Sequence, residues 1–217
     1  MQAQKIRYKA VIFDLDGVLV HTDEYHYLAW KQLCDLRKIP FDRTVNDLLR
    51  GVSRRESLEI ILSRAHVNLS EAEKESFLAE KNAVYRKFLE QMTPEDVGQE
   101  VRSTLRTLRE RGKKLAVGSS SKNTKFILAQ VGLEKFFDAV SDGTNITRTK
   151  PDPEVFLKAA QMLGVENGCC LVVEDAVSGV LAAEAAHMDC AAMGDAARHH
   201  RATYDIEHLS MLKDIVL

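Results

Sequence analysis

The chain has 217 residues, of which 45% are hydrophobic and 29% are charged, the balance of a globular protein with one sizeable domain or a domain with an insertion. Its formal net charge of −2 provides no basic field for nucleic acid. No apolar stretch reaches the length that spans a bilayer, so we expect neither a nucleic-acid nor a membrane partner.

The first apolar run is the most informative segment: residues 11–19 read Val-Ile-Phe-Asp-Leu-Asp-Gly-Val-Leu. A short β-branched run that ends in acids predicts a buried strand with Asp14 and Asp16 at its carboxyl end. Two carboxylates there are costly unless something pairs with them, and a divalent cation prefers such oxygen ligands. One acid could then attack phosphorus while the other moves a proton. The alternative is that the acids only form a turn or cap a helix.

Residues 21–93 show apolar spacing near 3.6 residues, many charges and no convincing strand. We therefore predict several helices inserted after the first strand. Such an insertion would stand over the carboxyl ends of the strands, where open α/β sheets bind ligands. It is a candidate lid over Asp14 and Asp16.

The second half of the chain alternates strand-like and helix-like segments, which predicts an α/β fold with a parallel sheet. Strands are expected at residues 114–119, 137–140, 169–173 and 189–193. Helices are expected at residues 123–131, 153–163 and 176–187.

Two polar loops in this half carry candidate phosphate-binding groups. The first contains Ser119, Ser120, Ser121, Lys122 and Asn123. Small hydroxyl residues and backbone amides at a helix start suit a phosphate, although serine-rich turns usually only cap helices. The second loop has two prolines that fix the backbone around Lys150. This lysine could neutralise a phosphoryl oxygen and an attacking carboxylate, or it could be a solvated surface residue.

A second acid pair, Glu174 and Asp175, follows another apolar strand. Asp175 could complete a magnesium site, with Glu174 as a nearby or water-mediated ligand. Alternatively Asp175 caps the next helix, and both roles can hold at once.

The four cysteines form no Cys-X-X-Cys pair: they are Cys34, Cys169, Cys170 and Cys190. This pattern is typical of buried, reduced thiols and argues against a zinc site. The polar first nine residues do not resemble a signal peptide, so we expect a cytoplasmic protein, and we expect a monomer. Arg198, His199 and His200 have metal-binding residue types without supporting spacing, and we interpret them as loop surface.

In the order acid pair, serine turn, Lys-Pro and acid pair, the chain resembles the haloacid dehalogenase-like phosphotransferases over essentially its whole length. The resemblance implies a Rossmann-like catalytic core formed by residues 1–20 and 94–217, with a helical cap domain formed by residues 21–93. It also implies Mg²⁺ as cofactor and an aspartyl-phosphate intermediate.

The same resemblance implies a role for each motif residue. Asp14 would be the nucleophile and Asp16 the general acid/base, with Ser119 on the transferring phosphoryl group and Lys150 balancing its charge. The metal ligands would be Asp14, the backbone carbonyl of Asp16, and Asp175, with Glu174 assisting. The pKa of Asp16 should rise when the lid excludes water, because this residue must donate a proton and later accept one.

Within this family, the residues after the first motif resemble those of sugar-phosphate mutases, which convert β-glucose 1-phosphate to glucose 6-phosphate through a bisphosphate. The implied substrate-binding residues are Thr22, His26, Trp30, Gly51, Val52, Ser53, Arg54, Lys81, Ser120, Ser121, Lys122 and Asn123. A bisphosphate needs a second anion site, and the planar guanidinium of Arg54 suits phosphate oxygens. His26 and Lys81 would lie over the sugar, and Trp30 and Val52 could cover its apolar faces.

Other interpretations stay open. His26 could be an ordinary helix residue, Trp30 could belong to the core of the cap, and Lys81 could be solvated. Only the motif match selects Arg54 over its neighbour Arg55. For the whole chain, the alternatives are a sugar-phosphate phosphatase with the same core and a catalytically silent binding protein on this fold. The intact set of acids, serine and lysine argues against the silent protein.

Overall fold

The computed structural model describes residues 8–49 and 52–216, and the chain divides into two compact units. The first, which we call the α/β unit, comprises Met1–Val20 and Thr93–Leu217. The second, which we call the helical unit, comprises His21–Met92.

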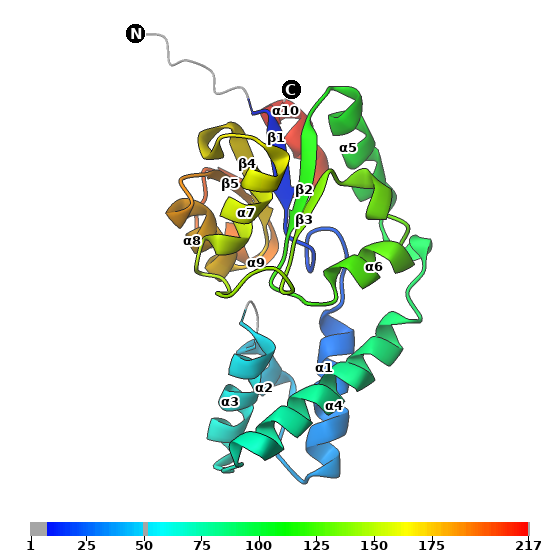
Figure 1. The fold of residues 1–217 in the computed structure, drawn as a ribbon, viewed down its shortest axis with the longest axis vertical. Helices are drawn as coiled ribbons and strands as arrows, with labels where there is room; N and C mark the ends of the chain where they lie inside the picture. Colours follow the sequence, from blue (N-terminus) through cyan, green and yellow to red (C-terminus); the bar gives the residue numbers. More distant parts are fainter. Residues whose placement is uncertain (1–7, 50–51, 217) are drawn as a thin grey trace. The chain divides into compact units, whose positions relative to one another are not determined.

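The α/β unit is built on a six-stranded sheet in the order β3-β2-β1-β4-β5-β6, with every pair of neighbours parallel (Figure 1). The strands are β1 (Ala10–Phe13), β2 (Lys114–Gly118), β3 (Ala139–Ser141), β4 (Cys170–Glu174), β5 (Asp189–Ala192) and β6 (Tyr204–Asp205). The predicted α/β fold with a parallel sheet is confirmed. Because β1 lies between β2 and β4, the loops that follow these three strands open at the same edge of the sheet.

Helices cover both faces of this sheet. They are α5 (Gln99–Glu110), α6 (Thr124–Gln130), α7 (Glu154–Leu163), α8 (Val177–Ala185), α9 (Gly194–Ala197) and α10 (Leu212–Val216). Figure 1 shows α7 and α8 on one side of the sheet and α5 and α6 on the other. The side with α7 and α8 has a continuous apolar core in which Ile12, Phe156 and Val172 are fully buried. Burial of both faces explains why the central strands are apolar throughout rather than alternating.

The helical unit contains the predicted helices and, among its described residues, no strand. The helices are α1 (Asp23–Leu36), α2 (Arg43–Asp47), α3 (Arg54–Ala65) and α4 (Glu71–Leu89). The last begins at a capping box, in which Ser70 and Glu73 satisfy each other's free backbone N–H groups. Trp30, Ile61 and Phe77 belong to the apolar core of the helical unit.

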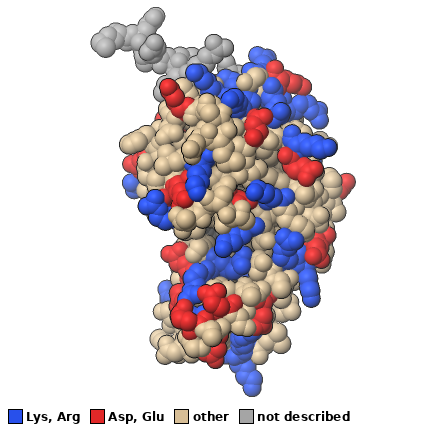
Figure 2. Space-filling model, in the orientation of Figure 1, with Lys and Arg blue, Asp and Glu red and all other residues tan. Residues whose placement is uncertain are grey.

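The surface carries charges of both signs, as the small net charge of the sequence predicts. Figure 2 shows acidic and basic side chains interspersed on the face in view. No helix in residues 8–49 or 52–216 combines the length and apolar character that a bilayer span requires.

All four cysteines are free, and Cys34, Cys170 and Cys190 are buried. Burial raises the pKa of the Cys34 thiol to about 12 and that of Cys170 to about 11, so these thiols are unreactive near neutral pH.

Candidate active site

The register of the sheet brings the predicted acids together. Phe13 is level with Val117 of β2 and with Val173 of β4. The next residue, Asp14, donates its backbone N–H to the Val173 carbonyl at 2.9 Å. Asp14 therefore lies beside Glu174, the last residue of β4, at the carboxyl edge of the sheet.

Two glycines allow the backbone to approach these acids closely. Gly17 has φ +82°, a left-handed conformation that favours glycine. A Cβ at Gly17 would lie 2.0 Å from Oδ2 of Asp175, and a Cβ at Gly179 would lie 1.9 Å from Cδ of Glu174. Side chains at either position would displace the acids, so these glycines help to define the site.

Lys150 connects the two acid pairs. Its Nζ donates to Oδ1 of Asp14 at 2.5 Å and also to Oε1 of Glu174. Lys150 is 7% exposed, Asp14 8% and Glu174 1%, so the surface-lysine interpretation does not hold. An ammonium group and two carboxylates at this depth stabilise one another, because each alone would pay a large desolvation cost.

The electrostatics follow from burial and from these contacts. Burial raises the pKa of Asp14 well above its ordinary value; the charge of Lys150 opposes this, and Glu174 adds to it. For Lys150, burial favours a lower pKa, but the carboxylates of Asp14 and Glu174 outweigh it, and the pKa rises above its ordinary value.

The acids fit a hard divalent cation. Carboxylate oxygens of Asp14, Glu174 and Asp175 all lie within 4.8 Å of one another, and oxygen donors of this kind suit Mg²⁺. The second oxygen of Glu174 accepts backbone N–H groups of Asp175 and Ala176 at 3.0 and 3.2 Å. Glu174 is thus engaged by Lys150 and by the backbone, which suits an assisting role. The N-cap residue of α8 is Ala176, whose side chain makes no cap bond, and Asp175 directly precedes it.

The serine loop lies at the end of β2, next to β1. Ser119 is 3% exposed and donates its N–H to the Ser141 carbonyl at 3.1 Å. Its Oγ accepts the Ser121 N–H at 3.1 Å, and Oγ of Ser121 accepts the N–H of Asn123 at 3.2 Å. Oγ of Ser120 is buried and has no hydrogen-bond partner in the described part of the chain. The hydroxyls therefore shape the loop itself, while α6 has no side-chain cap bond from Asn123.

The neighbouring Lys122 is exposed, in contrast to the buried Asn123. Asp16 is half-buried beside the site and forms an isolated parallel bridge with Val20.

In the helical unit, two polar residues at the start of α1, Thr22 and His26, contact two residues of α4. Nδ1 of His26 lies 2.7 Å from Nζ of Lys81, and Lys81 is 1% exposed. The Tyr85 hydroxyl donates to Oγ1 of Thr22 at 3.0 Å. The interpretation of Lys81 as a solvated residue is therefore wrong, and His26 has a specific partner.

The structure distinguishes the two neighbouring arginines. Arg55 is tied to Glu59, Glu71 and Glu75 in an ion-pair network. Arg54 is half-buried and makes no ion pair within residues 8–49 and 52–216. Burial lowers the pKa of Arg54, as expected for a cation without a carboxylate beside it. Arg54 is thus the residue of the pair that can accept an external anion.

The four other predicted cap residues are Trp30, Gly51, Val52 and Ser53, and each has a different outcome. Trp30 is 2% exposed and packs on Phe77 in the core of the helical unit, so its indole does not offer a free face to a sugar, and the core interpretation is the correct one. Val52 is half-buried. Ser53 is the N-cap of α3, where its side chain accepts the N–H of Glu56. Gly51 lies outside the described residues.

The histidine pair is on the surface, as expected. His199, His200 and Arg198 are exposed, and Nδ1 of His200 lies 2.6 Å from Oδ2 of Asp205. One residue of the helical unit that was not assigned a role, Tyr85, contacts several predicted site residues. Its position four residues after Lys81 on a predicted helix was the available signal.

Comparison with known proteins agrees with this geometry. Residues 8–187 match the haloacid dehalogenase-like hydrolases. The chain is 42% identical to a β-phosphoglucomutase of Bacillus subtilis over 86% of this chain and 83% of that protein. It is 32% identical to a phosphorylated carbohydrates phosphatase of Thermotoga maritima, over 83% and 82%.

A crystal structure of β-phosphoglucomutase from Clostridium difficile superposes with a TM-score of 0.90 at 31% identity, covering 96% of this chain and 97% of that one. The predicted resemblance is confirmed, both to the family and to its mutases. The acids, serine and lysine gathered at one edge of the parallel sheet are those that the family motifs predict. The chain is an enzyme of the haloacid dehalogenase-like hydrolase family.

Proposed function

We propose that the protein is a Mg²⁺-dependent β-phosphoglucomutase, which interconverts β-D-glucose 1-phosphate and glucose 6-phosphate through an aspartyl-phosphate and a bisphosphate. The observation that carries this proposal is Arg54, which is half-buried and makes no ion pair with the residues that the structure describes. A bisphosphate needs an anion site separate from the reacting phosphate, and a guanidinium matches phosphate oxygens with a planar fork. The similarity to two β-phosphoglucomutases supports it.

The first chemical step uses the residues at the sheet edge. An oxygen of Asp14 attacks phosphorus and forms a new O–P bond, while the bond from phosphorus to the sugar oxygen breaks. Asp16 donates a proton to the departing sugar oxygen. Mg²⁺ held by Asp14, the Asp16 carbonyl and Asp175, with Glu174 assisting, would supply positive charge between the two anions.

Lys150 and Ser119 act on the same phosphoryl group. The Lys150 ammonium lies 2.5 Å from the nucleophilic carboxylate and can balance the charge that builds up on the phosphoryl oxygens. Ser119, fixed by the Ser141 and Ser121 backbone, would donate to another phosphoryl oxygen. Transfer of a phosphoryl group depends mainly on such positioning and neutralisation.

The second step reverses the roles. Asp16, now ionised, removes the proton from the 6-hydroxyl of a bound β-glucose 1-phosphate, and that oxygen takes the phosphoryl group from Asp14. The bisphosphate then rebinds with its 1-phosphate toward Asp14, while Arg54 and the donors at Ser121, Lys122 and Asn123 hold the other end. Closure of the helical unit would keep water from the phosphoenzyme.

The second candidate is a sugar-phosphate phosphatase, for which the similarity to the phosphorylated carbohydrates phosphatase is the specific support. Product analysis separates the two. The enzyme is incubated with Mg²⁺, β-glucose 1-phosphate and a trace of β-glucose 1,6-bisphosphate. Glucose 6-phosphate as the main product supports the mutase, whereas stoichiometric inorganic phosphate supports the phosphatase. Omission of Mg²⁺ in the presence of a chelator is the control and should stop either reaction.

A further inference from the structure

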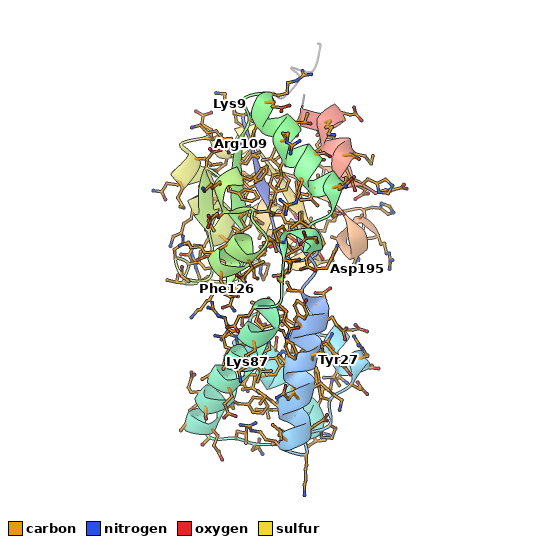
Figure 3. The ribbon with its side chains drawn as sticks, turned by 90° about the vertical axis from the view of Figure 1, so that its right-hand side faces the viewer. Lys9, Tyr27, Lys87, Arg109, Phe126 and Asp195 are labelled. Atoms are coloured by element: carbon orange, nitrogen blue, oxygen red, sulfur yellow. The ribbon has the colours of Figure 1, made fainter. Side chains whose placement is uncertain are left out.

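Tyr85 lies where the polar residues of the helical unit meet. Helices α1 and α4 pack along each other, as Figure 3 shows for the segments around Tyr27 and Lys87. Thr22 and His26 are four residues apart at the start of α1, and Lys81 and Tyr85 are four residues apart on α4. Such a spacing places each pair on one helix face. Thr22, the earlier residue of the first pair, contacts Tyr85, the later residue of the second pair, and His26 contacts Lys81. The two helices are therefore antiparallel at this point.

Tyr85 makes a different contact with each of the other three residues. Its hydroxyl donates to Thr22, and its ring lies 4.0 Å, centroid to centroid, from the ring of His26 at an angle of 30°. Nζ of Lys81 lies 4.4 Å from the centre of the same ring, within the range of a cation–π interaction. Tyr85 itself is 1% exposed. The hydroxyl of Thr22, which stands at the N-cap of α1, accepts from Tyr85 and makes no cap bond.

The contact with Lys81 determines the form of the His26 ring. A lysine ammonium has three donors and no acceptor, so Nδ1 of His26 must accept the hydrogen bond. A neutral imidazole whose Nδ1 is an acceptor has its proton on Nε2. Burial and the charges of Lys81 and Arg54 also hold the pKa of His26 well below its ordinary value. His26 is therefore a neutral ring whose Nε2 carries the proton and can donate it in a hydrogen bond.

We propose that Tyr85 is a positioning residue that holds the His26–Lys81 pair in this arrangement, so that His26 presents a fixed Nε2–H donor in the reaction. The proposal rests on the proposed sugar-phosphate chemistry for its purpose, but its physical content concerns the helical unit alone. Without the Tyr85 ring, Lys81 loses one aromatic neighbour and His26 loses the surface that covers one side of its ring.

The test uses the full chain and two variants that remove different parts of the Tyr85 side chain. Tyr85→Phe keeps the ring and removes the bond to Thr22, whereas Tyr85→Leu removes the ring. Tyr27→Leu is the matched control, because Tyr27 is next to His26 on α1 and has its own cation–π contact with Arg43, whose Cζ lies 3.8 Å from the ring centre. ¹⁵N and ¹H NMR of the substrate-free proteins reports the tautomer and the pKa of His26.

We expect the Nε2–H tautomer and a low His26 pKa in the wild type, in Tyr85→Phe and in Tyr27→Leu. In Tyr85→Leu, the pKa should move up toward about 6.5, the value of a free histidine, and both tautomers should appear. The kcat of this variant should fall about tenfold, since loss of a fixed orientation slows a positioned reaction. A folded Tyr85→Leu with an unchanged tautomer, pKa and kcat would overturn the proposal, because a purely structural tyrosine would change only the melting temperature.

If Tyr85→Leu does not fold, Tyr85→Met decides: this variant also removes the ring and should lose the single tautomer, and a retained Nε2–H form would contradict the proposal. The NMR measurements require no substrate. They therefore stand even if product analysis shows that the enzyme is not a mutase.

Discussion

Lys150 in the α/β unit and Lys81 in the helical unit are both buried, at 7% and 1% exposure, but they lie in opposite surroundings. Lys150 is between two carboxylates, Asp14 and Glu174. Lys81 contacts Nδ1 of His26 and two aromatic rings. The buried lysine of the α/β unit is thus paired with acids, whereas the buried lysine of the helical unit contacts a neutral ring nitrogen and aromatic faces.

This difference indicates a division of labour. Acids beside a lysine can hold a metal and attack phosphorus, since the lysine and the metal offset the repulsion between anions. A guanidinium and a buried ammonium can instead attract an anion such as phosphate. If chemistry belongs to one unit and anion binding to the other, substitutions in the two units should have different effects.

The largest effect should come from Asp14→Asn, which removes the attacking oxygen anion and keeps the size of the side chain. Turnover should fall by at least about 10⁴-fold, as expected for loss of a nucleophile. The substrate Kd, measured by calorimetry with Mg²⁺, should change far less, because the helical unit is intact. A variant that retained more than a few per cent of the activity would show that Asp14 is not the nucleophile.

Replacement of Lys150 should have the next largest effect. Lys150→Met should lower kcat about 10³-fold, comparable to the loss of a major charge-stabilising donor. The measurement is single-turnover phosphorylation of the protein by the bisphosphate. Lys9→Met, at an exposed lysine of the same unit directly before β1, is the control and should react at the wild-type rate. Equal rates in both variants would contradict the role of Lys150.

Arg54 and Arg55 offer a smaller but sharper comparison within one helix. Arg54→Ala should slow mutase turnover about 100-fold, since hydrogen bonds to charged groups contribute about 1.5–3 kcal/mol. Hydrolysis of a small phosphate ester, which has no second phosphate, should change little. Arg55→Ala should leave both rates near wild type, because the Arg55 guanidinium is already paired with glutamates. Equal losses for the two substrates in Arg54→Ala would refute the assignment of a distal phosphate clamp.

The smallest effect concerns Glu154, which holds the loop that carries Lys150. Oε2 of Glu154 accepts N–H groups of Thr147 and Arg148. These bonds, and that of Lys158, lower its pKa from 4.5 to about 2. A lowered native pKa means that the stabilisation is complete above about pH 4.5 and is lost as the pH falls toward 2. Urea unfolding at pH 6 and pH 3 should show a smaller pH dependence in Glu154→Gln, and an identical dependence would contradict this role.

The sequence made the α/β unit largely predictable. Apolar runs followed by acids, serines and a lysine mark strand ends, and the parallel topology brings those ends to one edge. The small strand β6, with only two residues, carries no periodic signal. The helix α5 has a strong apolar stripe but lies between the predicted segments, and no element was predicted there.

The helical unit was less predictable, because its site depends on how two helices pack. The choice between Arg54 and Arg55 is decided by glutamates on α3 and α4 that surround only Arg55. Trp30 has a residue type that suits both a sugar face and a core, and only the packing against Phe77 distinguishes them. The contacts of Tyr85 with residues near position 22 connect segments about 60 residues apart, which helical periodicity alone does not specify.

The central claim is that the Asp14 carboxylate takes up the phosphoryl group. The direct measurement is reductive trapping: the enzyme is mixed with Mg²⁺ and the bisphosphate, quenched, and treated with borohydride, which reduces an acyl phosphate to an alcohol. Mass spectrometry of the peptide that contains residues 11–19 should show the reduced side chain at Asp14, with none in the Asp14→Asn variant. Label on another residue, or turnover of the wild type without any label on this peptide, would contradict the account.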